Sequence, residues 1–182
     1  MAVLTIIANS ACSQNKTNGN MENKILVVYF SATGTTKQIA EKLANITNAD
    51  ICEITPSQPY TADDLNWHNS QSRSSIEMNS PESRPKIRAI NVDLKDYNVI
   101  FLGYPIWWDL SPRAVNTFIE SYDMTGKTVI PFATSGGSSI AGSVAALKKS
   151  YPNINWVDGN LLNGFNEKRL KTWCNKLGIS TL

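Results

Sequence analysis

The segment Lys24–Thr36 constrains the fold of this chain more than any other. Its apolar run, Ile25–Phe30, ends abruptly at a turn with hydroxyl groups at four of six positions, Ser31-Ala32-Thr33-Gly34-Thr35-Thr36. Apolar residues then recur at helical spacing from Ile39 to Ile46. We therefore predict a buried strand that passes through a short turn directly into a helix.

The hydroxyl-rich turn has the properties of an anion site. A helix start carries unpaired N–H groups and a partial positive charge, and Gly34 lets the backbone close around a small group. Since Ser31–Thr36 contains no Lys or Arg, neutral donors alone would hold a phosphate. The same hydroxyls are also ordinary helix N-caps, and neither a Walker loop nor the three-glycine dinucleotide motif is present. The loop alone leaves both interpretations open.

Strand-like and helix-like segments alternate along the rest of the chain. We expect strands at Ile25–Phe30, Asp50–Ile54, Val99–Gly103, Thr128–Ala133 and Asn155–Asp158. We expect helices at Thr35–Ile46, Pro112–Ser121, Ser138–Tyr151 and Asn166–Leu177. This alternation favours an α/β fold with a parallel sheet, and the wholly apolar central strands indicate that helices cover both of its faces.

A long polar segment, Tyr60–Ile90, interrupts this alternation. It is rich in Ser, Asn and Pro, and a short helix is expected around Ala62–Gln71. Long connections usually lie on the surface and only sometimes carry function. The segment is therefore either a surface crossover, which we favour, or a loop that reaches over a ligand.

Composition excludes several function classes. The formal net charge is +2, from 17 basic and 15 acidic residues, and the basic residues are scattered, so no nucleic-acid partner is expected. Cys12, Cys52 and Cys174 lie far apart, and the only histidine is His68. No metal site is therefore predicted. We assign Trp67, Trp156 and Trp173 to packing.

Residues 1–23 read as a tail and linker that precede a domain over residues 24–182. A short apolar start, Met1–Ala8, is followed by Ser10-Ala11-Cys12 and a polar run. Small residues before a cysteine are typical of bacterial lipoprotein signals, but Asn9 and the missing Lys or Arg depart from that pattern. The chain is expected to be either tethered to a membrane by a lipid anchor at Cys12 or cytoplasmic.

Three loops should meet at one edge of the predicted sheet. In open α/β sheets, ligands bind beyond the carboxyl ends of the strands, where the strand order reverses. The loops after the first, third and fourth strands are Ser31–Thr36, Tyr104–Asp109 and Thr134–Ser138. They supply a phosphate cradle, two adjacent tryptophans whose faces suit a flat ring, and two glycines that let backbone N–H groups approach its edge. A phosphate joined to a flat heteroaromatic ring describes flavin mononucleotide (FMN).

These loops resemble those of flavodoxins and flavodoxin-like reductases, in the short-chain type. The motifs are YFSATGTT at Tyr29–Thr36, GYPIWW at Gly103–Trp108 and ATSGGS at Ala133–Ser138. The resemblance covers about Lys24–Leu177 and implies a three-layer sandwich around a five-stranded parallel sheet of order 2-1-3-4-5, with noncovalent FMN. It places Ser31, Thr33, Gly34, Thr35 and Thr36 on the phosphate, Pro105, Ile106, Trp107 and Trp108 beside the ring, and Thr134, Ser135, Gly136 and Gly137 at its pyrimidine edge.

Two departures from the carrier flavodoxins bear on function. Those proteins are usually strongly acidic, which steers them to basic partners, whereas this chain is slightly basic. Their loop after the third strand often contains a glycine whose peptide flips to stabilise one-electron-reduced flavin, but Pro105–Asp109 contains none. Because bulky residues resist positive φ, we expect that flip to cost more here.

Three functions therefore remain open. The first is an FMN-dependent oxidoreductase that passes electrons from a donor such as NAD(P)H to a quinone-like or other acceptor. The second is a non-enzymatic electron carrier between redox partner proteins. The third is a flavin-free binding module, which the intact hydroxyl loop disfavours. No catalytic side chain is assigned, because the flavin itself supplies the redox chemistry.

Overall fold

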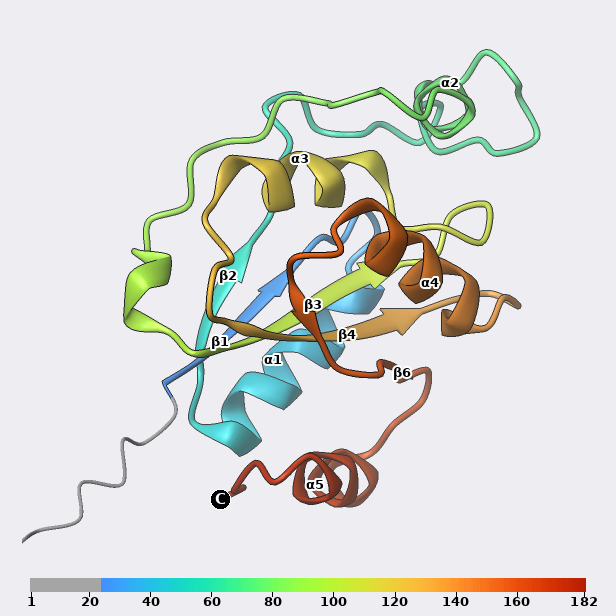
Figure 1. Cartoon of the computed structure of the whole chain (residues 1–182). Coiled ribbons are helices and arrows are strands. Elements are labelled where there is room, and N and C mark those ends of the chain that lie inside the picture. The colour runs from blue at the N-terminus through green and yellow to red at the C-terminus, as the bar shows by residue number, and fades with distance from the viewer. Residues whose placement is uncertain (1–23) are drawn as a thin grey trace, which may run out of the picture.

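A parallel sheet forms the centre of the computed structural model, which describes residues 24–182 (Figure 1). Its strands are β1 (Ile25–Tyr29), β2 (Asp50–Glu53), β3 (Val99–Pro105), β4 (Thr128–Thr134), β5 (Asn155–Trp156) and β6 (Asn160–Leu161). The strand order is β2-β1-β3-β4-β5, and β6 also pairs with β4. All pairings are parallel, so the predicted 2-1-3-4-5 order is confirmed.

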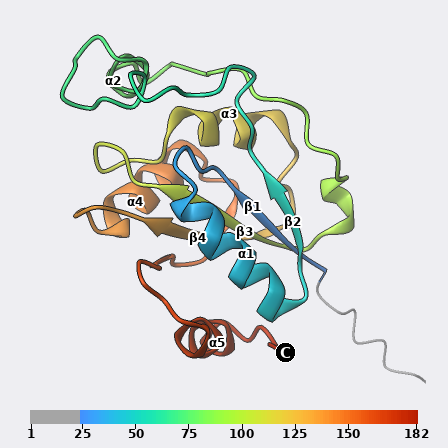
Figure 2. The same cartoon turned by 180° about the vertical axis from the view of Figure 1, so that it is seen from behind.

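Helices cover both faces of this sheet, which gives three layers. The four covering helices are α1 (Thr35–Thr47), α3 (Arg113–Ser121), α4 (Ile140–Ser150) and α5 (Glu167–Lys176). Helices α1 and α5 lie on one face and α3 and α4 on the other (Figures 1 and 2). Successive strand residues point to opposite faces, so Val27 packs in the core beside α1 and α5, while Val28 packs in the core beside α3 and α4.

The fifth strand differs from the prediction, because β5 and β6 replace the expected Asn155–Asp158. Val129 O and Ala133 O accept bonds from Val157 N (2.9 Å) and Leu162 N (2.8 Å). Pro131 lies between these two acceptors and has no N–H to donate to the same neighbour. A Cβ added at Gly159 would lie 2.6 Å from Pro131 O. The ladder is therefore interrupted opposite the proline, and two short strands result.

The segment between β2 and β3 passes over the outer side of α3, beyond the three layers of the sandwich (Figures 1 and 2). Its helix is α2 (Arg73–Asn79), followed later by the 3₁₀ turn Leu94–Asp96. The helix expected at Ala62–Gln71 is therefore misplaced. Helix α2 begins where Ser72 Oγ accepts a bond from Ser75 N (3.3 Å), an ordinary N-cap that the sequence contained.

Side chains of α3 attach this crossover segment to the sheet domain. Arg84 forms two hydrogen bonds with the Glu120 carboxylate, at 2.7 and 2.8 Å. The Thr117 hydroxyl donates to Pro85 O (3.0 Å), and Ile90 N donates to the Tyr122 hydroxyl (3.0 Å). These bonds seat the crossover on the domain surface.

The tryptophan and cysteine predictions have mixed outcomes. Trp173 is buried and Trp156 packs against the core, but Trp67 is 66% exposed and stacks on His68, so its assignment to packing is wrong. Cys52 and Cys174 are buried thiols. The Cys12 prediction lies outside the described residues. Within residues 24–182, no helix combines the length and apolar character needed to cross a membrane.

Replacing Gly103 by alanine is expected to destabilise the fold by about 1–3 kcal/mol, the usual cost of overpacking a core. A Cβ at this position would lie 2.2 Å from Phe132 Cζ, so the ring on β4 would have to move. Urea unfolding measures the loss. Gly136→Ala is the matched control, because nothing lies within 4 Å of its added Cβ. Equal unfolding midpoints for the two variants would contradict this packing argument.

Candidate functional site

The loops after β1, β3 and β4 meet at the carboxyl edge of the sheet. The hydroxyls of Thr36 and Thr134 lie 2.8 Å apart and are buried, which joins the first loop to the third. Ile106 N donates to Thr134 O at 2.8 Å, which joins the second loop to the third. The structure therefore brings together the three segments that the sequence analysis singled out.

The first loop ends in an open helix start. Gly34 is the N-cap of α1 with φ +87°, and its N–H donates to Ser31 Oγ (3.1 Å). No side chain caps the helix, and the N–H groups of Thr35, Thr36 and Lys37 have no acceptor within residues 24–182. The exposed hydroxyls of Thr33 and Thr35 lie 3.4 Å apart. This donor set fits an anionic oxygen group such as a phosphate.

Thr36 contributes differently from the other predicted phosphate residues. Its side chain is 1% exposed and its hydroxyl pairs with Thr134, so its backbone N–H is the group that faces the open helix start. A pocket of about 330 Å³ runs along α1 from Thr35 to Lys42 and is also lined by Thr134. Its opposite wall is the loop that precedes α5, residues 163–166.

The second loop divides its two tryptophans between the core and the surface. Trp107 is partly buried and meets the Phe30 ring edge-on, with centroids 5.6 Å apart and planes at 87°. Trp108 is 44% exposed. Pro105, the last residue of β3, and Ile106, the other predicted ring neighbours, are half-buried. Trp108 is therefore the indole that is free to stack on a ligand.

The backbone at Trp107–Leu110, which we term the Trp turn, contradicts one expectation. Trp108 and Asp109 have φ +47° and +61°, although we expected bulky residues here to resist positive φ. Bonds of 3.0 Å from Trp107 N to Leu110 O and 2.9 Å from Leu110 N to Trp107 O close the turn. Two consecutive positive φ values define a type I′ turn, which matches the twist of a two-residue hairpin.

The third loop is organised around Ser135. Its hydroxyl accepts bonds from Gly137 N (3.1 Å) and Ser138 N (2.8 Å), while Gly136 N stays free of such a bond. An added Cβ would meet no atom at Gly136 or Gly137, so the backbone there is open on its outer side. This loop can present backbone N–H groups to a ligand edge.

Two further residues of the site escaped the sequence analysis. Asn163, just after β6, accepts a bond from Ser135 N (2.8 Å) and donates to Ser135 O, so it holds the third loop. It lies at the carboxyl end of β6, a strand that the sequence did not predict, so no predicted strand end indicated it. Tyr60 of the crossover meets Trp107 edge-on, with centroids 5.4 Å apart, and no local pattern indicated this contact.

Tyr104 lies beneath the site and is fully buried. Its hydroxyl is 3.1 Å from Ser143 Oγ on α4, and burial raises the pKa of Tyr104 to about 12. The phenol therefore stays protonated at neutral pH and serves as a packed support under the loops.

Comparisons with known proteins agree with this architecture. A protein from Bacteroides eggerthii, described as a proposed flavoprotein, is 54% identical and has a TM-score of 0.84; the match covers 86% of this chain and 99% of that one. A second proposed flavoprotein, from Bacteroides uniformis, is 50% identical with a TM-score of 0.82, covering 84% and 98%. No match was found among curated proteins.

A more distant structure shares the fold. A flavoprotein from Lactobacillus acidophilus, solved in complex with FMN, is 21% identical with a TM-score of 0.66 and covers 83% of this chain and 98% of its own. The family model described as flavodoxin matches residues 24–177, which include all three loops. The chain belongs to the flavodoxin family.

Proposed function

We propose that this chain binds FMN at the carboxyl edge of its sheet and acts as an oxidoreductase. The proposal rests on three features that lie together at this edge: an uncapped helix start, an exposed Trp turn and an open glycine loop. Direct hydrogen bonds join the three loops that carry them. The family supports the choice of cofactor, and the FMN-bound structure from Lactobacillus acidophilus shares the fold.

Each loop has a distinct part in holding the cofactor. The hydroxyls of Thr33 and Thr35, which contact only each other, and the open first N–H groups of α1 would hold the phosphate. Trp108 would lie against the ring, and the backbone of Ser135–Gly137 would meet its polar edge. When bound, FMN supplies the transfer of electrons or hydride, while the protein orients it and excludes water.

The geometry of the Trp turn favours two-electron chemistry. Reversing the peptide between Trp108 and Asp109 would convert the type I′ turn to type II′, in which the first central residue adopts φ and ψ of roughly +60° and −120°. That region is open mainly to glycine. The Trp108 side chain therefore locks the peptide in one orientation, and a flip that stabilises one-electron-reduced flavin is disfavoured. The barrier therefore lies in the flip to type II′, since Trp108 and Asp109 already adopt positive φ.

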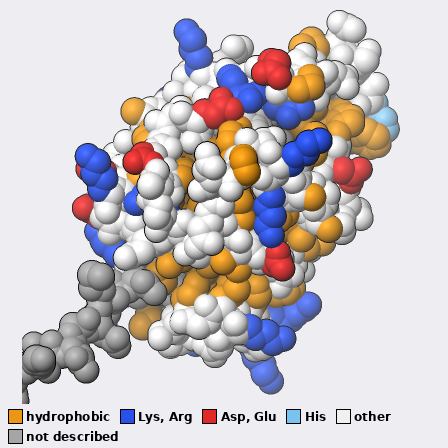
Figure 3. All heavy atoms as spheres, viewed as in Figure 1, with side chains coloured by type: hydrophobic (Ala, Val, Ile, Leu, Met, Phe, Trp, Pro, Cys, Tyr) orange, Lys and Arg blue, Asp and Glu red, His pale blue; other side chains and the backbone are white. Residues whose placement is uncertain are grey.

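Surface charge favours a small-molecule partner. The formal net charge is +2, and on the face shown in Figure 3 acidic and basic side chains are interspersed. The chain therefore lacks the strong net negative charge that steers a carrier to basic partner proteins. We therefore propose a donor such as NAD(P)H and a quinone-like acceptor.

Anaerobic reduction of the FMN-loaded protein tests this function. Stepwise reduction is expected to bleach the flavin spectrum directly, and NAD(P)H with a quinone should give turnover. A stable long-wavelength band of one-electron-reduced flavin, without NAD(P)H turnover, would instead assign the chain to the electron carriers.

A further inference from the structure

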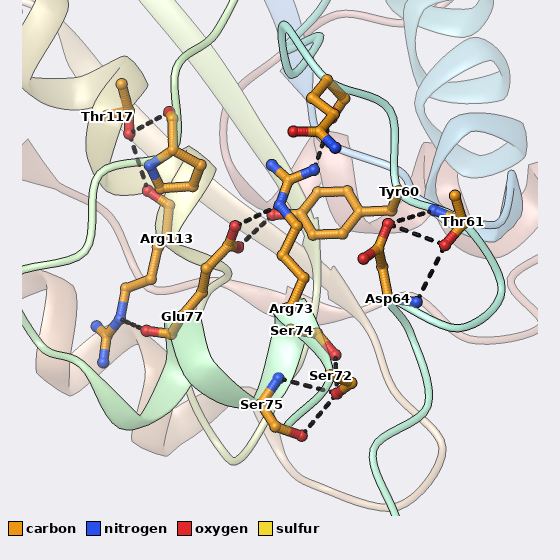
Figure 4. Close-up of polar contacts among 12 residues, drawn as sticks. Tyr60, Thr61, Asp64, Ser72, Arg73, Ser74, Ser75, Glu77, Arg113 and Thr117 are labelled. Atoms are coloured by element: carbon orange, nitrogen blue, oxygen red, sulfur yellow. Dashed lines mark hydrogen bonds and ion pairs between the residues drawn. The ribbon is translucent and has the colours of Figure 1, made fainter. Parts of the chain in front are cut away.

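A buried carboxylate lies in the crossover segment, outside the three loops of the site. Glu77 on α2 is 8% exposed. Its Oε1 accepts a bond from Arg73 Nε at 2.7 Å, and its Oε2 accepts a bond from the Tyr60 hydroxyl (Figure 4). A buried charge is costly unless it is paired, so both bonds are needed for Glu77 to occupy this position.

The Glu77–Arg73 pair holds Tyr60 by its hydroxyl, by its ring and by the backbone that precedes it. Glu77 holds the hydroxyl, and the Arg73 guanidinium lies 4.0 Å from the centroid of the Tyr60 ring. Arg73 Nη1 also donates to Gln58 O at 2.8 Å, two residues before the tyrosine. Burial and hydrogen bonding to Glu77 raise the pKa of Tyr60, so its hydroxyl remains a donor.

Tyr60 in turn fixes the start of the Trp turn. Its ring meets Trp107 at 5.4 Å and 83°, and Phe30 at 5.9 Å and 71°. With the Phe30–Trp107 contact, the three rings form a mutually edge-to-face group. Since Phe30 directly precedes the hydroxyl loop, this group connects the crossover to both ends of the proposed FMN pocket.

The last turn of α2 also contacts the segment that follows the Trp turn. Arg113, at the start of α3, is buried and donates from Nε to Glu77 O at 3.3 Å (Figure 4). Its Nη2 also donates to Met78 O at 3.0 Å. A cation that bonds the last carbonyls of a helix is favourably placed. Helix α2 is therefore linked through Tyr60 to Trp107 before Trp108, and bonds directly to Arg113 after Asp109.

We propose that Glu77 is a positioning residue that holds the Trp turn in its left-handed conformation. Together with Tyr60 and Arg113 it forms what we term the α2 clamp, which links α2 to Trp107 on one side of the turn and to the start of α3 on the other. Two consecutive non-glycine residues at positive φ are strained, and contacts outside the turn must offset that strain. This inference rests on the proposed function, because the clamp fixes Trp108 where it would meet the flavin ring.

Amide hydrogen exchange in the cofactor-free protein tests the clamp. In Glu77→Gln, the amides of Trp107 and Leu110, which close the turn, should exchange about tenfold faster, as expected when one buried hydrogen bond is lost. Tyr60→Phe removes only the hydroxyl and should act in the same direction. Asp64→Asn is the control, because the carboxylate of this half-buried residue accepts bonds only from Thr61 within the crossover.

FMN affinity provides the second readout. Glu77→Gln and Tyr60→Phe should bind FMN several-fold more weakly than wild type, while Asp64→Asn should match it. Unchanged exchange at both turn amides, or equal acceleration throughout β3 and β4, would overturn the clamp. If wild type binds FMN and the exchange is unchanged, only the clamp fails. If exchange accelerates but no variant or wild type binds FMN, the proposed function fails and the clamp stands.

Discussion

Replacing Thr33 and Thr35 together by alanine is expected to lower the affinity for FMN about a hundredfold. Hydrogen bonds to a charged group contribute about 1.5–3 kcal/mol each, and about 1.4 kcal/mol is tenfold in Kd. In the ligand-free structure these two exposed hydroxyls contact only each other, so removing them should leave unfolding free energy within about 0.5 kcal/mol of wild type. Quenching of flavin fluorescence during titration measures the affinity.

The control for this prediction is Thr172→Ala on α5. Thr172 is also exposed, and its hydroxyl bonds only Lys168 O within its own helix. It should leave FMN affinity unchanged. If the double variant binds FMN as tightly as the control, the hydroxyls do not hold the phosphate and its site must be sought elsewhere.

Replacing Trp108 by glycine is expected to unlock the peptide flip that the native turn disfavours. Only glycine readily adopts the backbone that a type II′ turn needs at this position, and the barrier removed is about 1–3 kcal/mol. Anaerobic reduction of Trp108→Gly should therefore accumulate one-electron-reduced flavin, seen as a long-wavelength band. Loss of the indole should also weaken FMN binding roughly ten- to hundredfold, the usual value of one aromatic stack.

Two further variants distinguish the effect of the backbone conformation at Trp108 from the effect of its indole side chain. Trp108→Ala loses the indole without gaining glycine's freedom, so it should bind FMN as weakly as Trp108→Gly yet bleach directly on reduction. Asp109→Gly keeps the indole and leaves Trp108 to block the flip, so it too should bleach directly. Accumulation of one-electron-reduced flavin in Trp108→Ala would show that the indole, and not the locked peptide, sets the redox behaviour.

The sequence predicted the sheet because its signals are local. Short apolar runs bounded by turn residues, such as Val99–Gly103, favour buried strands, and their alternation with helices favours a parallel arrangement. The fifth strand was mispredicted because its interruption depends on Pro131, a residue of the neighbouring strand. The predicted crossover helix ends before Ser72, whereas α2 begins after it, because a polar segment has weak helical periodicity and several serines could equally serve as its N-cap.

The sequence predicted those parts of the site that lie in loops directly after predicted strands. The three loops are each contiguous in sequence, and their meeting follows from sheet topology. The α2 clamp was not predictable, because Tyr60, Glu77 and Arg113 come together only through the crossover's path over α3. The type I′ turn was missed for a related reason: its residues, Trp108 and Asp109, lack the usual glycine or asparagine, and distant contacts hold their backbone.

Parallel titration with FMN and riboflavin tests the central claim most directly. If the open start of α1 holds the phosphate and Trp108 meets the ring, FMN should quench to saturation at one molecule per chain. Riboflavin, which lacks the phosphate, should bind at least about a hundredfold more weakly, because the charge-assisted hydrogen bonds are lost. Equal affinity for the two flavins, or no saturable binding of FMN, would contradict the account.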